Sequence, residues 1–196
     1  EYVKLKSKIE EVYEKTKEKS VIMGHSQGTS FVSIFISNFT TPEWAQKYID
    51  SVIFLAPAFA GWPSFQRIFT QSFSPFKTCD ELKKSIMRMP GLHIMTPNHA
   101  IYGDIPIIHN WHQDYDQDNA TQVVPWLRSL NKMDDESVEI YKAFIEKFQK
   151  VPVPEPPVPS FILYNDGIGT NVRYIHYLRQ NRIVSKIPHP GDGTVT

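Results

Sequence analysis

The chain has no net charge, few glycines and a single cysteine, and each shortage excludes a class of protein. Its 196 residues carry 21 Lys plus Arg against 21 Asp plus Glu, so no long-range field would collect nucleic acid or another polyanion. The one cysteine, Cys79, can form no disulfide within the chain. The longest nearly apolar run, Val52 to Trp62, is shorter than the roughly 18 residues of a membrane-spanning helix.

What is present indicates an ordered globular domain. Apolar residues make up 41% and aromatic residues 13% of the chain, which excludes a disordered protein. Fifteen prolines against nine glycines predict stiff connections rather than flexible linkers. The length is that of one ordinary domain.

The first 60 residues alternate between helical and strand-like patterns. The helical patterns cover residues 1–20, 29–39 and 43–49, the first with an apolar face of Leu5, Ile9, Val12 and Tyr13 and the last with Thr41 as N-cap before Pro42. Short apolar runs at residues 20–23 and 52–55 predict strands, the second buried on both faces of a parallel sheet. This alternation predicts an α/β fold.

The later chain is less regular. Residues 61–150 form an irregular stretch with one clear helix, at 134–148, and are too long for a normal connection, so we predict an inserted cap or lid. Its aromatic stripe could line an acyl-chain groove or simply pack on the sheet (Phe65, Ile68, Phe69, Phe73 and Phe76). Residues 151–196 return to the core through a proline-rich strap and a third buried strand at 161–164.

Residues 24–28 read Gly-His-Ser-Gln-Gly between a predicted strand and a predicted helix, which is the context of a nucleophile elbow. In such a turn Ser26 projects its hydroxyl from the sheet edge, and the flanking glycines avoid collisions with the strand and the helix. The N–H of Gln27 then faces the position where an oxyanion would form. Ser26 is therefore the predicted nucleophile and Gln27 the predicted oxyanion donor.

A serine nucleophile needs a histidine base and an acid that orients it, in the chain order serine, acid, histidine. Asp166 and Asp192 are both placed to be the acid, and position alone does not separate them. All seven histidines precede Asp192, and His176 and His189 could serve only if Asp166 were the acid. We expect His25, beside the nucleophile, to be a packing residue, and the base to lie beyond Thr196.

A metal site is a weaker hypothesis. His109, His112, Asp114, Asp116 and Asp118 lie within ten residues, and such groups can bind zinc or calcium. The calcium-loop pattern fails because Asn119 replaces its glycine and Pro125 replaces its closing glutamate. We predict no metal and no cofactor.

Four segments together resemble the lecithin:cholesterol acyltransferase family, which includes lysosomal phospholipases and phospholipid:diacylglycerol acyltransferases. They are the elbow, residues 55–62, residues 163–170 and the terminal Gly-Asp-Gly-Thr-Val at 191–195. The resemblance implies a partial α/β-hydrolase fold with an inserted cap. It also implies that Asp192 is the catalytic acid and that the histidine lies downstream of this chain. The elbow with Gln27 and Thr29 also resembles acid lipases, which do not place their acid in Gly-Asp-Gly-Thr-Val.

These observations predict a lipid acyl-ester hydrolase or acyltransferase with a Ser-Asp-His triad. Its acyl donor would be a phospholipid, and its acceptor a sterol, diacylglycerol or water, with peripheral contact to a lipid surface possible. The alternatives are an acid-lipase-like hydrolase of neutral lipids, a hydrolase of small soluble esters and a non-catalytic lipid-binding module. Sequons at Asn38 and Asn119 are compatible with a glycoprotein of the secretory pathway, lysosomal or extracellular. We expect the second oxyanion donor to lie in a loop outside this chain.

Overall fold

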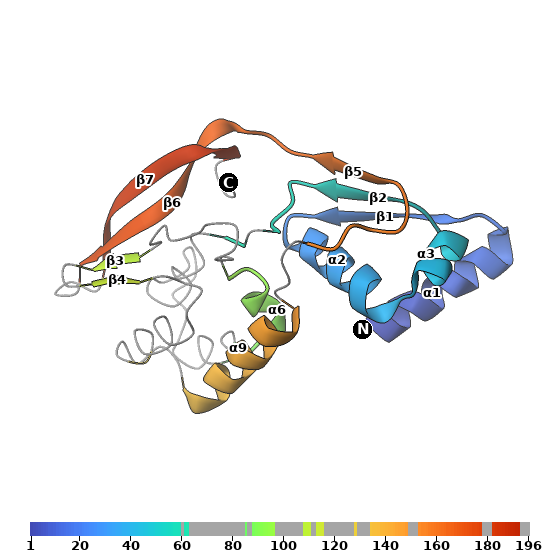
Figure 1. Ribbon diagram of the computed structural model, residues 1–196, viewed down its shortest axis with the longest axis horizontal. Coiled ribbons are helices and arrows are strands. Elements are labelled where there is room, and N and C mark those ends of the chain that lie inside the picture. The colour runs from blue at the N-terminus through green and yellow to red at the C-terminus, as the bar shows by residue number, and fades with distance from the viewer. Residues whose placement is uncertain are drawn as a thin grey trace. The chain divides into compact units, whose positions relative to one another are not determined.

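The chain divides into two compact units, one of residues 1–59 and 150–165 and the other of residues 60–149 and 166–196. The computed structural model describes residues 1–59, 61–62, 85, 88–96, 108–110, 113–115, 128, 134–148, 153–177 and 182–192. Within these, it describes only the backbone of residues 108–110, 113–115, 144–148, 169–177 and 182–192. Figure 1 labels the elements of both units.

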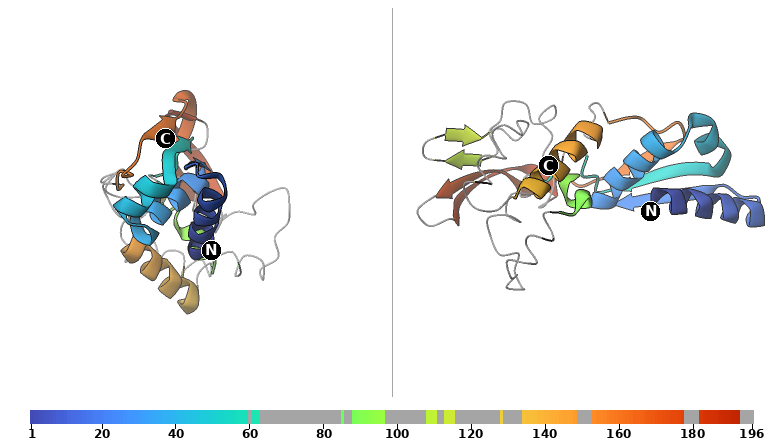
Figure 2. Two further views of the ribbon diagram at one scale, coloured as in Figure 1. Left: turned by 90° about the vertical axis from the view of Figure 1, so that its right-hand side faces the viewer. Right: turned by 90° about the horizontal axis from the view of Figure 1, so that it is seen from below.

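The first unit is a parallel sheet with three helices on one of its faces (Figures 1 and 2). Its strands are ordered β1-β2-β5, with bounds Ser20–His25, Ile49–Leu55 and Ser160–Leu163. Both neighbouring pairs are parallel. The helices are α1 (Tyr2–Thr16), α2 (Gln27–Phe39) and α3 (Pro42–Tyr48). The predicted α/β class is confirmed, and the order of strand β1, turn and helix α2 is that expected for part of an α/β-hydrolase fold.

The sequence sets the helix ends in this unit. Thr41 caps α3 as predicted, because its hydroxyl accepts the backbone N–H of Trp44 at 3.2 Å and Pro42 occupies the first helical position. Helix α1 ends at Thr16, and the C-cap residue Lys17 has a φ of 60°, which lets its N–H donate to the carbonyl of Tyr13 at 2.7 Å. Each end therefore satisfies backbone groups that a bare helix terminus leaves open.

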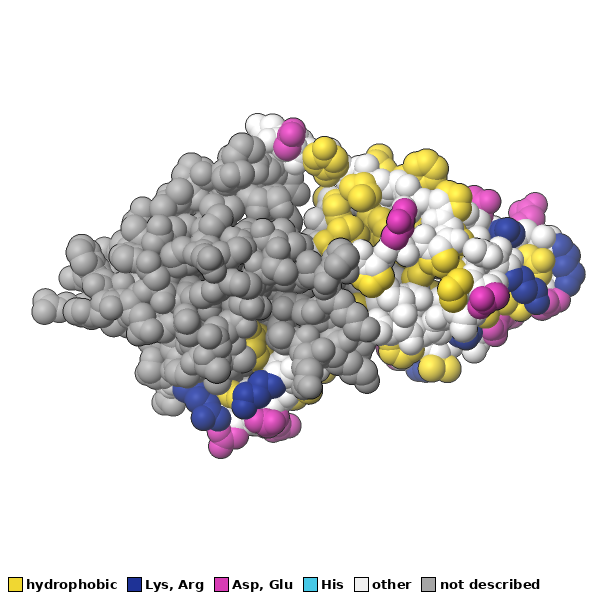
Figure 3. Space-filling model, viewed as in Figure 1, with side chains coloured by type: hydrophobic (Ala, Val, Ile, Leu, Met, Phe, Trp, Pro, Cys, Tyr) yellow, Lys and Arg dark blue, Asp and Glu magenta, His cyan; other side chains and the backbone are white. Residues whose placement is uncertain are grey.

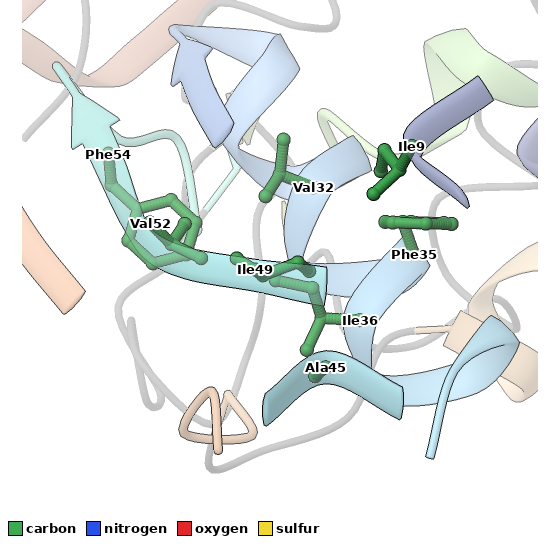
Figure 4. Packing of buried hydrophobic residues seen from close by; sticks show 8 residues of the cluster. All are labelled: Ile9, Val32, Phe35, Ile36, Ala45, Ile49, Val52 and Phe54. Atoms are coloured by element: carbon green, nitrogen blue, oxygen red, sulfur yellow. The ribbon is translucent and has the colours of Figure 1, made fainter. Parts of the chain in front are cut away.

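The core of the first unit lies between the helices and the facing side of the sheet (Figure 4). Phe35 of α2 and Val52 of β2 are fully buried, and Phe35 meets the ring of Trp44 edge-on at 5.9 Å. Burying side chains of this size stabilises the fold by roughly 1.5–3 kcal/mol each. Eight residues form this cluster: Ile9, Val32, Phe35, Ile36, Ala45, Ile49, Val52 and Phe54.

The other face of the sheet carries exposed apolar side chains. The strand register places five of them on one side: Val21, Met23, Leu55, Phe161 and Leu163. The visible face of this unit shows many hydrophobic side chains (Figure 3). The prediction of strands buried on both faces was therefore wrong for Leu55, which is 38% exposed, and for all of β5. Leu55 is exposed because α1, α2 and α3 lie on the opposite face, and β5 is exposed on both faces at the edge of the described sheet, where Ile162 is also 56% exposed.

The second unit contains a four-stranded sheet and a pair of packed helices. The strand order is β4-β3-β6-β7, with bounds Gln113–Tyr115, Ile108–Asn110, Gly167–Tyr177 and Arg182–Asp192. The helices described in this unit are α6 (Pro90–His93) and α9 (Asp135–Phe148), the latter confirming the helix predicted at 134–148. The aromatic stripe of the cap lies outside the described residues.

Polar contacts fix the start of α9. The Asp134 carboxylate accepts the Ser137 hydroxyl at 2.7 Å and the Ser137 N–H at 2.9 Å, and it pairs with Arg88 at 2.7 Å. These contacts, the Ser137 hydroxyl first, hold the pKa of Asp134 well below its usual range. One turn further on, the buried Tyr141 ring meets the buried His93 ring edge-on at 5.5 Å. None of the described helices combines the length and apolarity needed to cross a membrane.

Candidate active site

The turn between β1 and α2 holds the predicted nucleophile in a rare backbone conformation. Ser26 has φ 53° and ψ −124°, a region that residues other than glycine seldom adopt. Such a conformation costs about 1–3 kcal/mol and persists only where the surrounding structure holds it. Strained single residues of this kind gather at functional sites. The local geometry is therefore that of a nucleophile elbow.

The two glycines of the motif have different structural roles. A Cβ placed on Gly24 would come within 2.8 Å of the carbonyl oxygen of Gly28 and the Cα of Thr29. Only glycine therefore lets α2 start so close to β1. A Cβ on Gly28 would meet no described atom within 4 Å. The predicted steric reason is confirmed for Gly24 and wrong for Gly28, which faces open space within the described structure.

Backbone hydrogen bonds fix Ser26 from both sides. Its N–H donates to the carbonyl of Leu55, the last residue of β2, at 2.9 Å. Its own carbonyl accepts the Thr29 N–H at 3.0 Å and the Thr29 hydroxyl at 2.6 Å. Ser26 is the N-cap residue of α2 but makes no side-chain cap bond, although serine commonly caps helices in that way. Its hydroxyl is therefore not used to start the helix.

Gln27 is the first residue of α2, so its N–H belongs to the positive end of the helix dipole. No acidic residue lies in the first turn of α2 to oppose that field. A negative oxygen forming beside Ser26 would be stabilised by such a helix terminus. The role of Gln27 as oxyanion donor stays a prediction.

The two candidate acids belong to the second unit, whereas Ser26 belongs to the first. Asp192 is the last residue of β7, and its backbone pairs with Ile168 of β6; its side chain lies outside the described structure. Asp166 is exposed and lies between β5 and β6. The pairing of Ser26 with either acid stays a prediction.

The histidines have varied surroundings. His25 is exposed at the end of β1, so the expectation that it is a packing residue was wrong. The strand alternation places it on the face opposite the helices. His93 is buried against Tyr141 in the second unit. His109, His176 and His189 are described by backbone alone, whereas His99 and His112 lie outside the described residues.

Sequence reasoning missed the residues whose hydrogen bonds hold the elbow turn in place. Thr29 is fully buried, and besides its bond to Ser26 its hydroxyl accepts the N–H of Ala58 at 3.1 Å. Ala56, between β2 and Ala58, has a positive φ of 47°. The available signal was a threonine in the first turn of a helix, where its hydroxyl can bond to the carbonyl three residues earlier. The second partner, far away in sequence, gave no local signal.

Comparison with known protein families supports the resemblance for two of its four segments, the elbow and residues 55–62. Residues 1–74 match the sequence profile of the family described as lecithin:cholesterol acyltransferase. No match was found among curated protein sequences. Among ten matching chains of known structure is the lipase BlEst2 of Bacillus licheniformis in mature form, with 13% identity and a TM-score of 0.37. That alignment covers 84% of this chain and 46% of the lipase chain, so this chain spans about half of the lipase's length.

The contrast between the two glycines gives a prediction for stability. Gly24→Ala forces a Cβ against backbone atoms of α2, and we expect it to lower the free energy of unfolding by about 1–3 kcal/mol or more. Gly28→Ala adds a methyl group to a helix with no steric conflict among the described residues, and we expect a gain of about 0.4–1 kcal/mol. Denaturant unfolding of both variants checks this, and equal stabilities would contradict it.

Proposed function

We propose that this chain is the nucleophile-bearing part of a lipid acyl-ester hydrolase or acyltransferase. The observation that carries the proposal is the strained Ser26 between β1 and α2, within the segment that matches the acyltransferase family. In the proposal Ser26 is the nucleophile, Gln27 donates its N–H to the oxyanion and Asp192 is the acid. The base is a histidine outside this chain.

The first half-reaction cleaves an ester of a phospholipid. The Ser26 oxygen attacks the acyl carbonyl carbon while its proton passes to the histidine, which Asp192 orients. The carbonyl oxygen becomes negative and is stabilised at the N-terminus of α2. The bond to the glycerol oxygen then breaks, the histidine returns the proton to that oxygen, and the lysophospholipid leaves. The product is an acyl ester on Ser26.

The second half-reaction decides between the two activities. An acceptor hydroxyl loses its proton to the histidine, and its oxygen attacks the acyl carbon of the acyl-enzyme. The bond from that carbon to the Ser26 oxygen then breaks, and the histidine returns the proton to Ser26. A sterol or diacylglycerol yields a new ester, whereas water yields a free fatty acid. The elbow has the same part in the reaction whether the acyl acceptor is an alcohol or water. A cap formed by residues 61–150 would favour transfer by excluding water, and this division of the chain is part of the proposal.

A neutral-lipid hydrolase is the second candidate. The observation favouring it is the elbow sequence Gly-His-Ser-Gln-Gly-Thr at residues 24–29, which resembles that of acid lipases. The two candidates share the first covalent step and differ in the donor. They are distinguished by offering phospholipid and triacylglycerol separately.

Replacing the nucleophile tests the proposal. In the full-length protein, Ser26→Ala removes the attacking oxygen, and we expect fatty-acid release from phosphatidylcholine vesicles to fall on the order of 10⁶-fold. Ser37→Ala is a matched control, because Ser37 lies on the same helix and, among the described residues, its hydroxyl bonds only to the Ser33 carbonyl, at 2.6 Å. Undiminished release by Ser26→Ala would overturn the proposal.

The same assay separates the two activities when an acceptor is added. Cholesterol or diacylglycerol in the vesicles yields a new ester if the protein is an acyltransferase, and unchanged fatty-acid release if it is a hydrolase. Triacylglycerol emulsions in place of vesicles test the neutral-lipid candidate. Vesicle binding that Ser26→Ala leaves intact, with no turnover by either protein, would identify a lipid-binding module instead.

The choice between the two acids gives a second prediction. Asp192→Asn removes the charge that would orient the base, and we expect kcat to fall on the order of 10⁴-fold. Asp166→Asn is the matched control, with the same change at an exposed position, and we expect kcat close to that of the unsubstituted protein. The reverse result would assign the acid to Asp166 and would make His176 or His189 the candidate base.

We also propose that the protein follows the secretory route. Asn38 is exposed near the end of α2, and Thr40 follows it in an extended conformation outside the helix. A glycan on Asn38 would therefore face solvent. Expressed through a eukaryotic secretory pathway, the protein should lose mass on enzymatic removal of N-glycans, and Asn38→Gln should remove one glycan. Asn119→Gln tests the second sequon separately, and secreted protein without glycan at Asn38 would contradict the prediction.

A further inference from the structure

The segment that follows β2 is held against the nucleophile elbow. The Leu55 carbonyl accepts the Ser26 N–H at 2.9 Å, and the next residue, Ala56, donates its N–H to the Leu163 carbonyl of β5 at 2.7 Å. Ala56 has φ 47°, so the chain turns sharply here. Pro57 follows, and Ala58 is then fully buried. The chain that leaves β2 after Leu55, the residue bonded to Ser26, therefore makes a second strained turn at Ala56.

Thr29 joins this turn to the elbow through a single hydroxyl group. The hydroxyl donates to the Ser26 carbonyl at 2.6 Å and accepts the Ala58 N–H at 3.1 Å. Both Thr29 and Ala58 are fully buried, so water cannot readily replace either bond. Buried backbone groups of this kind are almost always paired. The Thr29 hydroxyl therefore pairs two backbone groups at once, the Ser26 carbonyl and the Ala58 N–H.

The next residue adds a weaker contact to the same segment. The Ser30 hydroxyl donates to the Ala58 carbonyl at 3.3 Å. Two consecutive residues of the first turn of α2 thus bond both backbone polar groups of Ala58. The Thr29 bonds are shorter, and only Thr29 also reaches the Ser26 carbonyl.

We propose that Thr29 is a positioning residue for the reaction of Ser26, an inference that rests on the proposed function. Ser26 and Ala56 both hold positive φ angles, and either turn would relax to a commoner conformation if released. The Thr29 hydroxyl bonds to the Ser26 carbonyl in the first turn and to the Ala58 N–H just after the second. It thereby fixes the direction of the Ser26 side chain and of the Gln27 N–H, without touching the substrate.

The test replaces the hydroxyl with a methyl group of similar size. Thr29→Val removes both hydrogen bonds, and we expect kcat to fall by up to about 10²-fold, as for other small misplacements of reacting groups, with KM little changed. The rate at which a fluorophosphonate labels Ser26 should fall by the same factor. Thr29→Ser keeps the hydroxyl and should restore both rates to within about twofold.

Controls separate positioning from stability. Thr40→Val makes the same change at the other end of α2, where the hydroxyl donates to the Ile36 carbonyl at 2.7 Å and to no other described residue. In unglycosylated protein it should leave kcat and labelling unchanged. All variants are assayed below the melting temperature of the least stable one, with circular dichroism confirming the folded state. If Thr29→Val does not fold, Thr29→Ala replaces it with the same expectation.

The outcomes distinguish this inference from the proposed function. A folded Thr29→Val or Thr29→Ala variant with unchanged kcat and labelling rate would overturn the positioning role alone, because the unsubstituted protein still reacts at Ser26. Loss of activity that Thr29→Ser does not restore would also overturn it, since the methyl group would then be what matters. An unsubstituted protein that neither labels nor turns over lipid would overturn the proposed function itself.

Discussion

The arrangement of the first unit depends on one close approach, that of α2 to β1 at Gly24. Because Gly24 has no side chain, the Gly28 carbonyl oxygen and the Thr29 backbone can lie within 2.8–2.9 Å of the position that a Cβ would occupy. The chain must therefore reverse within the two residues after Gly24, and Ser26 adopts a positive φ to do so. The strained serine is a consequence of how tightly a helix packs on the strand before it. Leu55 and Thr29 then hold the backbone in that conformation.

The structural features that the sequence predicted correctly are those that a local pattern of residues determines. Strands, helices and the Thr41 cap followed from apolar spacing and from residues at helix ends, because these signals lie within a few positions of the structure they predict. The exposure of β5 was not predictable in this way, since burial depends on what covers a strand from elsewhere in the chain. The contacts of Thr29 were not predicted for the same reason, because its second partner, Ala58, is close to it only in the folded chain. The acid rested on a resemblance, and it stays a prediction.

Helix α2, which begins at the elbow, carries a backbone dipole but no charged side chain. The first and last turns of α2 carry no acidic and no basic residue, respectively, so the helix dipole at Ser26 is unopposed within its own element. Among the described residues of the first unit, the ion pairs lie on or beside α1, where Glu11 bonds to Lys8 and Lys15 on the exposed surface. Exposed pairs contribute little to stability. The elbow should therefore be less sensitive to salt than a site built from surface charges.

Pairing of β2 with β5 also constrains how the protein is made. Leu55 pairs with Leu163, more than a hundred positions later, and this contact supports the turn beside the nucleophile. During synthesis, β2 therefore has an unpaired edge until the distant strand has left the ribosome. Contacts so distant in sequence form slowly, and unpaired strands with apolar side chains associate readily with other chains. The yield of folded protein should then depend on how well that edge is shielded, by a chaperone or by slow synthesis, until its partner arrives.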